Sequence, residues 1–261
     1  MIDLFLNFMS ERFLDGLNYA IQAGWIVLAI LVIRILPIRL PKWSICLLWG
    51  LVALRLMLPF QIEFDWSLQP SAQPIPQNIA MERVPEIDSG VEVIDRVVNP
   101  VVTESFAPDP VASANPLQIL IPLASVAWLL GIAVMLLYAL ISTLRLGHRV
   151  KASVREGKYY LCDDIQMPFV FGLVRPKIYL PSGISVNTLP HVLAHEERHI
   201  KRLDHLWKPL GFLILSIYWF HPLFWVGYIL FCRDLERPVT RRWWESLIRV
   251  IEKPIPKPSF R

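Results

Sequence analysis

The sequence predicts a mainly α-helical membrane protein with three transmembrane helices, a cytosolic domain that contains short strands, and a helical hairpin that dips into the membrane. Three observations predict this fold class. The composition is 54% hydrophobic, with a mean hydropathy of +0.45, and the apolar residues gather in long blocks. The segments that connect these blocks differ in the sign of their charge. Short aromatic and β-branched runs follow the third block.

The first three apolar blocks cover residues 19–38, 44–62 and 116–144. Each is long enough to cross a hydrocarbon core of about 30 Å as a helix. The first block lacks the basic segment and the small-residue cleavage site of a signal peptide, so we expect it to stay in the protein. Residues 1–62 are therefore predicted to form two transmembrane helices with a short cytosolic turn, and residues 116–144 to form the third.

The charges between the blocks predict the orientation. The connection 63–115 is rich in proline, lacks sustained periodicity and holds two arginines against nine acids, so we expect a loosely ordered external loop. The nine acids are Glu63, Asp65, Glu82, Glu86, Asp88, Glu92, Asp95, Glu104 and Asp109. Behind the third block the basic residues are Arg145, Arg149, Lys151, Arg155 and Lys158. Because positive charge favours the cytosolic side, the N-terminus is predicted outside and the domain 145–236 inside.

A fourth apolar block covers residues 206–231 and is followed by a basic tail, 237–261. The basic tail favours a return to the cytosol. His221-Pro222 divides the block into two pieces that are each too short to span a bilayer. We therefore expect a re-entrant helical hairpin within the domain 145–236.

The domain 145–236 begins with strands and continues into a helix. "FVFGLV" and "KIYLP" are aromatic and β-branched runs separated by turn residues, which predicts short strands. The helix "TLPHVLAHEERHIKRLDHL" follows, with Pro190 in its first turn, where proline is tolerated.

The motif "HEERH" on that helix predicts a metal site. His195 and His199 lie four residues apart on one helical face, so both imidazoles can bind a single Zn²⁺. Glu196 is placed to take a proton from water activated by the metal. A charged, solvated helical face would explain the same letters, but the apolar residues before the motif and the adjacent hairpin favour metal binding.

A catalytic zinc normally has a third protein ligand, and three residues compete for this role. Asp204 and His205 follow the motif closely, but we expect an uninterrupted helix that turns both away from the site. Asp204 then fits better as a partner of nearby cationic side chains. Glu236 is brought back towards the histidines by the hairpin and is favoured, although it is also spaced to pair with Arg233.

The segment "HVLAHEERHIKRLDHLWKPLGFLILSIYWFHPLFWVGYILFCRDLE", preceded by "MPFVFGLVRPKIYLP", resembles the BlaR/MecR-type membrane metallopeptidases. These are sensor-transducers behind inducible β-lactam resistance. The resemblance implies a gluzincin-like HExxH zinc-peptidase domain with His195, His199 and Glu236 as metal ligands and Glu196 as catalytic base. It also implies an antirepressor activity, in which a cytosolic DNA-binding repressor, or the receptor itself, is cleaved.

The chain departs from this family after Glu236. Family members continue into "LACDE", whereas "RPVTRRWWESLIRV" follows here, and no S-x-x-K or K-T-G constellation is present. We therefore expect a truncated or diverged member, in which Pro238 shortens the helix that holds Glu236. Two alternatives stay open: a catalytically inactive remnant, and a housekeeping membrane protease of the HtpX/Ste24 type.

The expected cofactor is Zn²⁺, and the expected partners are a protein substrate, such as a transcriptional repressor, and the lipid bilayer. No direct contact with nucleic acid is expected, and a homodimer is left open. The predicted location is the cell membrane, with several passes, the N-terminus outside and the peptidase site in the cytosol.

Overall fold

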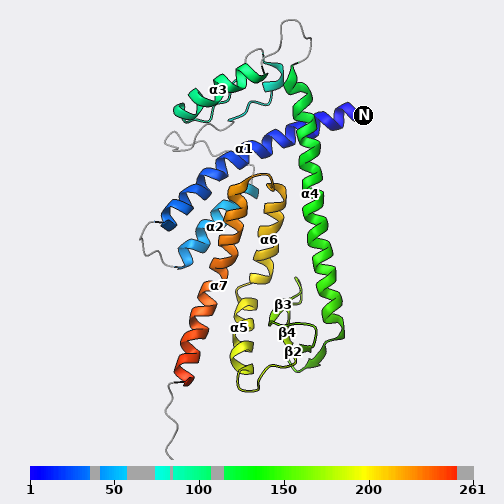
Figure 1. The fold of residues 1–261 in the computed structure, drawn as a ribbon, viewed down its shortest axis with the longest axis vertical. Coiled ribbons are helices and arrows are strands. Elements are labelled where there is room, and N and C mark those ends of the chain that lie inside the picture. The colour runs from blue at the N-terminus through cyan, green and yellow to red at the C-terminus, as the bar shows by residue number, and fades with distance from the viewer. Residues whose placement is uncertain (36–41, 58–73, 83–84, 107–114, 252–261) are drawn as a thin grey trace, which may run out of the picture. The chain divides into compact units, whose positions relative to one another are not determined.

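The computed structural model describes residues 1–35, 42–57, 74–82, 85–106 and 115–251, and most of them are helical (Figure 1). The α-helices are α1 (Ile2–Ile35), α2 (Lys42–Met57), α3 (Glu92–Phe106), α4 (Pro116–Arg149), α5 (Leu189–Lys201), α6 (Asp204–Ile217) and α7 (Pro222–Ile251). The strands are β1 (Val154–Glu156), β2 (Tyr159–Cys162), β3 (Phe169–Phe171) and β4 (Lys177–Pro181), and the 3-10 helices are Ile79–Met81 and Val150–Ala152. The mainly helical fold and the small sheet are confirmed.

The chain divides into two compact units. The first contains α1, α2 from Leu47, α3, α4 up to Leu137, and residues 214–227. The second contains α4 from Tyr138, the strands, α5, α6 up to Leu213, and α7 from Tyr228. The proposed metal site lies in the second unit.

Two helices of the described residues are long and apolar enough to cross a membrane, namely Leu4–Ile35 and Pro116–Ala152. The most apolar window of the second has a mean hydropathy of 2.5 and is only 6% buried, so most of its apolar side chains face outward. The expected span at 44–62 is not confirmed. Helix α2 has 16 residues, or about 24 Å, which is short of a bilayer core, and residues 58–62 lie outside the described part of the chain.

In the first unit, α1 buries small and aliphatic side chains, including Ala20, Ala23 and Val27. Gly131 of α4 is required by close packing, because a Cβ there would lie 2.1 Å from the Trp219 ring. The Trp219 indole donates a hydrogen bond to the Trp128 carbonyl (3.2 Å), and the Trp128 indole donates one to the Ile217 carbonyl (2.7 Å). These bonds join α4 to residues 214–227 within this unit.

The expectation of a loosely ordered segment between the second and third blocks was wrong for its described residues. They include α3, in which the Asp95 carboxylate accepts a hydrogen bond from the Ser89 amide (2.8 Å). Asn99 binds both the amide and the carbonyl of Ile87. Asn18 of α1 likewise binds both backbone groups of Ile75. Such side-chain bonds to backbone help to order the segment around α3.

In the second unit, the four strands form one sheet in the order β1-β2-β4-β3. The pairs β1–β2 and β3–β4 are antiparallel, and β2–β4 is parallel, with Tyr160 opposite Tyr179. Ile178, Tyr179 and Leu180 of β4 are buried and form the core of the sheet. Helix α5 contacts β3 and β4. The sheet therefore supports the helix that carries the HEERH motif.

The helix after the motif is not continuous, contrary to prediction. Helix α5 ends at Lys201, Leu203 takes a positive φ of 61°, and α6 begins at Asp204. A residue in the left-handed region cannot continue a right-handed helix, so the chain changes direction there. The second interruption was predicted and is confirmed: α6 ends at Ile217 and α7 begins at Pro222.

Helix α7 continues past Pro238, although this proline was expected to shorten it. A proline removes one backbone donor from a helix, and a helix of 30 residues retains most of its other hydrogen bonds. Within the second unit, Gly211 of α6 faces Tyr228 and Phe231 of α7, and the Tyr228 hydroxyl donates to the Lys208 carbonyl (3.4 Å). These contacts hold the two helices together near Glu236.

Candidate metal centre

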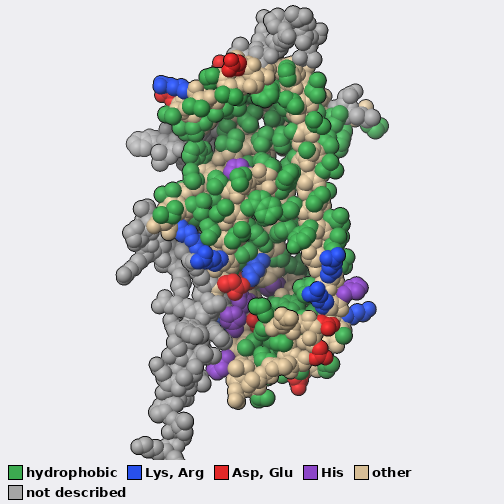
Figure 2. Space-filling model, in the orientation of Figure 1, with side chains coloured by type: hydrophobic (Ala, Val, Ile, Leu, Met, Phe, Trp, Pro, Cys, Tyr) green, Lys and Arg blue, Asp and Glu red, His purple; other side chains and the backbone are tan. Residues whose placement is uncertain are grey.

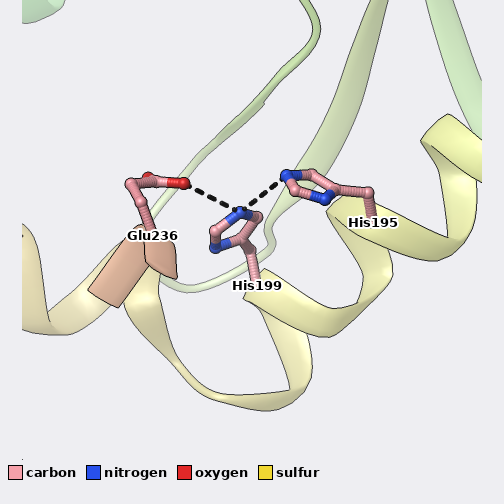
Figure 3. Close-up of side chains that lie close together, drawn as sticks. All are labelled: His195, His199 and Glu236. Carbon is pink, nitrogen blue, oxygen red and sulfur yellow. Dashed lines mark hydrogen bonds and ion pairs between the residues drawn. The ribbon is translucent and has the colours of Figure 1, made fainter. Parts of the chain in front are cut away.

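Two helices bring three donor atoms together (Figure 3). His195 and His199 lie one turn apart on α5, with 3.3 Å between their Nε2 atoms. Glu236 comes from α7, and its Oε2 lies 3.5 Å from Nε2 of His199. All three donor atoms lie within 4.8 Å of one another. The three residues that carry these atoms are the ligands predicted from the sequence, and their role as ligands stays a prediction.

The donor set fits a zinc ion. Zinc takes nitrogen and oxygen ligands at about 2.0–2.1 Å in a tetrahedron, which puts neighbouring ligand atoms about 3.3 Å apart. The two short separations, 3.3 Å and 3.5 Å, agree with this spacing. Two imidazoles and one carboxylate are also the kind of set that leaves a fourth position for water or substrate.

Asp204 was predicted to point away from the site, and this prediction was wrong. Its Oδ2 lies 2.7 Å from Nδ1 of His199, and its side chain is 3% exposed. The break at Leu203 explains the difference, because Asp204 belongs to a new helix rather than to the next turn of α5. Its other oxygen lies 3.6 Å from Arg202, in keeping with the predicted cationic partner.

The contact with Asp204 defines the tautomer of His199. When Nδ1 carries the proton and donates it to Asp204, Nε2 presents its lone pair to the neighbouring donor atoms. Sequence reasoning missed this role because nothing at positions 202 and 203 indicates a break. His205, the other rejected candidate, lies outside the cluster of donor atoms found among the described residues.

Lys208 is a second residue that sequence reasoning missed. Its Nζ lies 2.6 Å from Oε1 of Glu236, while the other oxygen of that carboxylate faces His199. Lys208 is one helical turn after Asp204 on α6. One turn of α6 thus provides a partner for a histidine and a partner for the carboxylate.

Burial and neighbouring charges shift the pKa values of the ionisable groups in the site. Burial raises the pKa of Glu196, which is 7% exposed, and the charge of His199 opposes this rise. Burial lowers the pKa of His195, and the charge of His199 adds to the effect. For Glu236, burial opposes ionisation, but the hydrogen bond and charge of Lys208 outweigh it and lower its pKa. A neutral His195 and an ionised Glu236 are the forms that bind metal.

The chain is similar to proteins of a known family. The family model described as BlaR1 peptidase M56 matches residues 14–238, which include all four proposed site residues. The regulatory protein BlaR1 of Bacillus licheniformis is 34% identical over 122 residues, covering 38% of this chain and 20% of that protein. The methicillin resistance mecR1 protein of Staphylococcus aureus is 28% identical over 91 residues, covering 33% of this chain and 16% of that protein. The matched part thus covers about a fifth of the length of these relatives or less. The family model, in contrast, covers most of the chain, so the chain belongs to the BlaR1 peptidase M56 family.

Proposed function

We propose that the chain is a zinc endopeptidase embedded in the membrane, of the antirepressor or signal-transducer type. The observation that carries this proposal is the convergence of His195, His199 and Glu236 beside the buried Glu196. The family of the chain, named for a peptidase, supports the same chemistry.

The residues divide the work of peptide hydrolysis. A zinc ion, when bound, supplies a Lewis acid for the scissile carbonyl and makes water more acidic. Glu196 takes a proton from the attacking water and passes it to the leaving amine, and its raised pKa suits it to both steps. Asp204 orients His199, and Lys208 orients Glu236.

The proposed substrate is a cytosolic regulatory protein or the chain itself. One relative is named a regulatory protein, which supports a signalling role. An extended peptide can add to the sheet at β3, which lies at its edge and contacts α5. Pairing at this edge would bring a scissile bond towards the HEERH helix.

The proposed topology places the N-terminus outside and the site in the cytosol, with residues 206–231 of α6 and α7 forming a re-entrant hairpin. Contacts at the tip of the hairpin support its proposed insertion into the membrane. In the first unit, Gly24 faces His221, and Gly227 faces Val27 and Trp49. Gly24 and Val27 both lie in the apolar block 19–38. Protease added to intact cells should cut within 63–115, whereas a tag after Arg261 should stay protected.

Two variants of the full-length protein test the activity. Glu196→Gln should keep about one zinc per chain but abolish cleavage of itself and of fluorogenic peptides, because only the base is removed. Glu197→Gln is the matched control and should keep both. Loss of metal in Glu196→Gln alone, or full activity without this carboxylate, would refute the assignment of Glu196 as the base.

A further inference from the structure

We propose that the turn between β3 and β4, residues 172–176, docks on the anionic lipid surface where α4 leaves the membrane. The contact is made by the side chains of Leu173, Val174 and Arg175. The proposal depends on α4 crossing the bilayer and is independent of the metal chemistry.

The turn presents two adjacent aliphatic side chains to the surroundings. Leu173 is 57% exposed and Val174 is 93% exposed. The backbone that carries them is tightly folded, because Gly172 has a φ of 113° and a Cβ there would lie 2.7 Å from the Arg175 carbonyl oxygen. A stiff turn that holds apolar groups away from the sheet fits contact with a second apolar environment.

The position of the turn along α4 identifies that environment. Phe171, the residue before the turn, packs at Gly147 of α4, where a Cβ would lie 3.9 Å from its ring. Leu144, three residues earlier and 55% exposed, ends the apolar surface of α4, and Arg145 follows it. The turn therefore starts within a few residues of the change from apolar to basic that marks a membrane boundary.

The charges around the turn fit an anionic surface. Arg145 and Arg149 of α4 and Arg175 of the turn are all exposed. Figure 2 shows hydrophobic side chains along α4 and Lys and Arg side chains near its basic end. Inserted aliphatic side chains flanked by cations are the usual chemistry of attachment to anionic lipid headgroups.

Docking of this turn would hold the peptidase helix at a fixed depth. The turn joins β3 to β4, and both strands contact α5, which carries His195 and His199. The sheet would then link α5 to the bilayer through a contact other than the helical spans.

The test uses the full chain in lipid nanodiscs, with its three native cysteines replaced and one introduced as Val174→Cys. An environment-sensitive fluorophore at this position should be quenched by lipids carrying a nitroxide near the headgroup. Val186→Cys is the matched control: it is also an exposed valine, at 82%, but it follows the opposite end of β4. We expect several-fold stronger quenching at position 174 than at 186, and Leu173→Cys should repeat the result if labelling at 174 disturbs the turn.

The lipid composition separates the charge contribution from the apolar one. Replacing part of the phosphatidylcholine with phosphatidylglycerol should increase the quenching at 174, and Arg175→Gln should remove this increase. Equal, weak quenching at positions 173, 174 and 186 would overturn the proposal. Shielding of the 174 probe only on addition of a peptide would also overturn it, and would assign the turn to substrate binding instead.

Discussion

The chain interrupts its helices twice between His199 and Glu236, and the two breaks differ in kind. The break at residues 218–221 is followed directly by Pro222, which lacks a backbone donor, and sequence reasoning located it. The break at Leu203 contains no proline or glycine and depends on one leucine with a positive φ. The break before Pro222 returns the chain so that Glu236 lies beside the histidines. The break at Leu203 turns Asp204 towards His199. A site can therefore depend as much on a break without a sequence signal as on one that has it.

The largest expected effect concerns Glu236, the residue that the break before Pro222 returns to the site. Glu236→Ala should weaken zinc binding roughly 100-fold or more, because loss of a direct ligand should exceed the usual cost of losing a partner of a ligand. Competition with a chelator of known affinity measures this. Glu197→Ala is the control. An unchanged zinc affinity in Glu236→Ala would show that this break does not serve to bring a metal ligand to the site.

The next effect tests the break at Leu203 through Asp204. Asp204→Asn should weaken zinc binding about 10-fold, since the charged partner of His199 is lost while its shape is kept. His205→Ala, at the neighbouring position outside the donor cluster, should leave the affinity unchanged. The same chelator competition compares the two variants, and equal effects would show that Asp204 has no special contact with His199.

A smaller effect concerns the backbone at Leu203. Leu203→Gly should stabilise the protein by about 1 kcal/mol, because the left-handed conformation costs leucine more than glycine. The side chain is 47% exposed, so little packing is lost. Leu206→Gly, inside α6, should instead destabilise by about 1 kcal/mol. Thermal unfolding in detergent measures both, and a lower melting temperature for Leu203→Gly would count against strain at this position.

The smallest effect concerns Pro222, at the first position of α7. Pro222→Ala should cost less than about 1 kcal/mol, because a residue there has no helical partner for its backbone donor. Zinc affinity should not change. A large loss of zinc would mean that the proline alone enforces the reversal and that the packing around it contributes little.

These contrasts explain what the sequence could predict. Strands β3 and β4 were predictable because aromatic and β-branched residues cluster there between turn residues. Helix α3 was missed although its valines recur at helical spacing, because it is only 15 residues long, lies in a proline-rich segment and has Pro100 inside it. In the site, the two histidines follow from helical spacing, but the contacts of Asp204 and Lys208 depend on tertiary geometry that spacing does not encode.

The bond between Lys208 and Glu236 also bears on the order of assembly. An acid held among histidines without a cation would leave a half-buried negative charge uncompensated, which disfavours the folded state. Lys208 supplies that compensation from within the chain, at 2.6 Å. Many small zinc domains fold only as the metal binds. We therefore expect the polypeptide to fold first and to acquire the metal afterwards, so that metal supply would regulate the proposed activity rather than the survival of the protein.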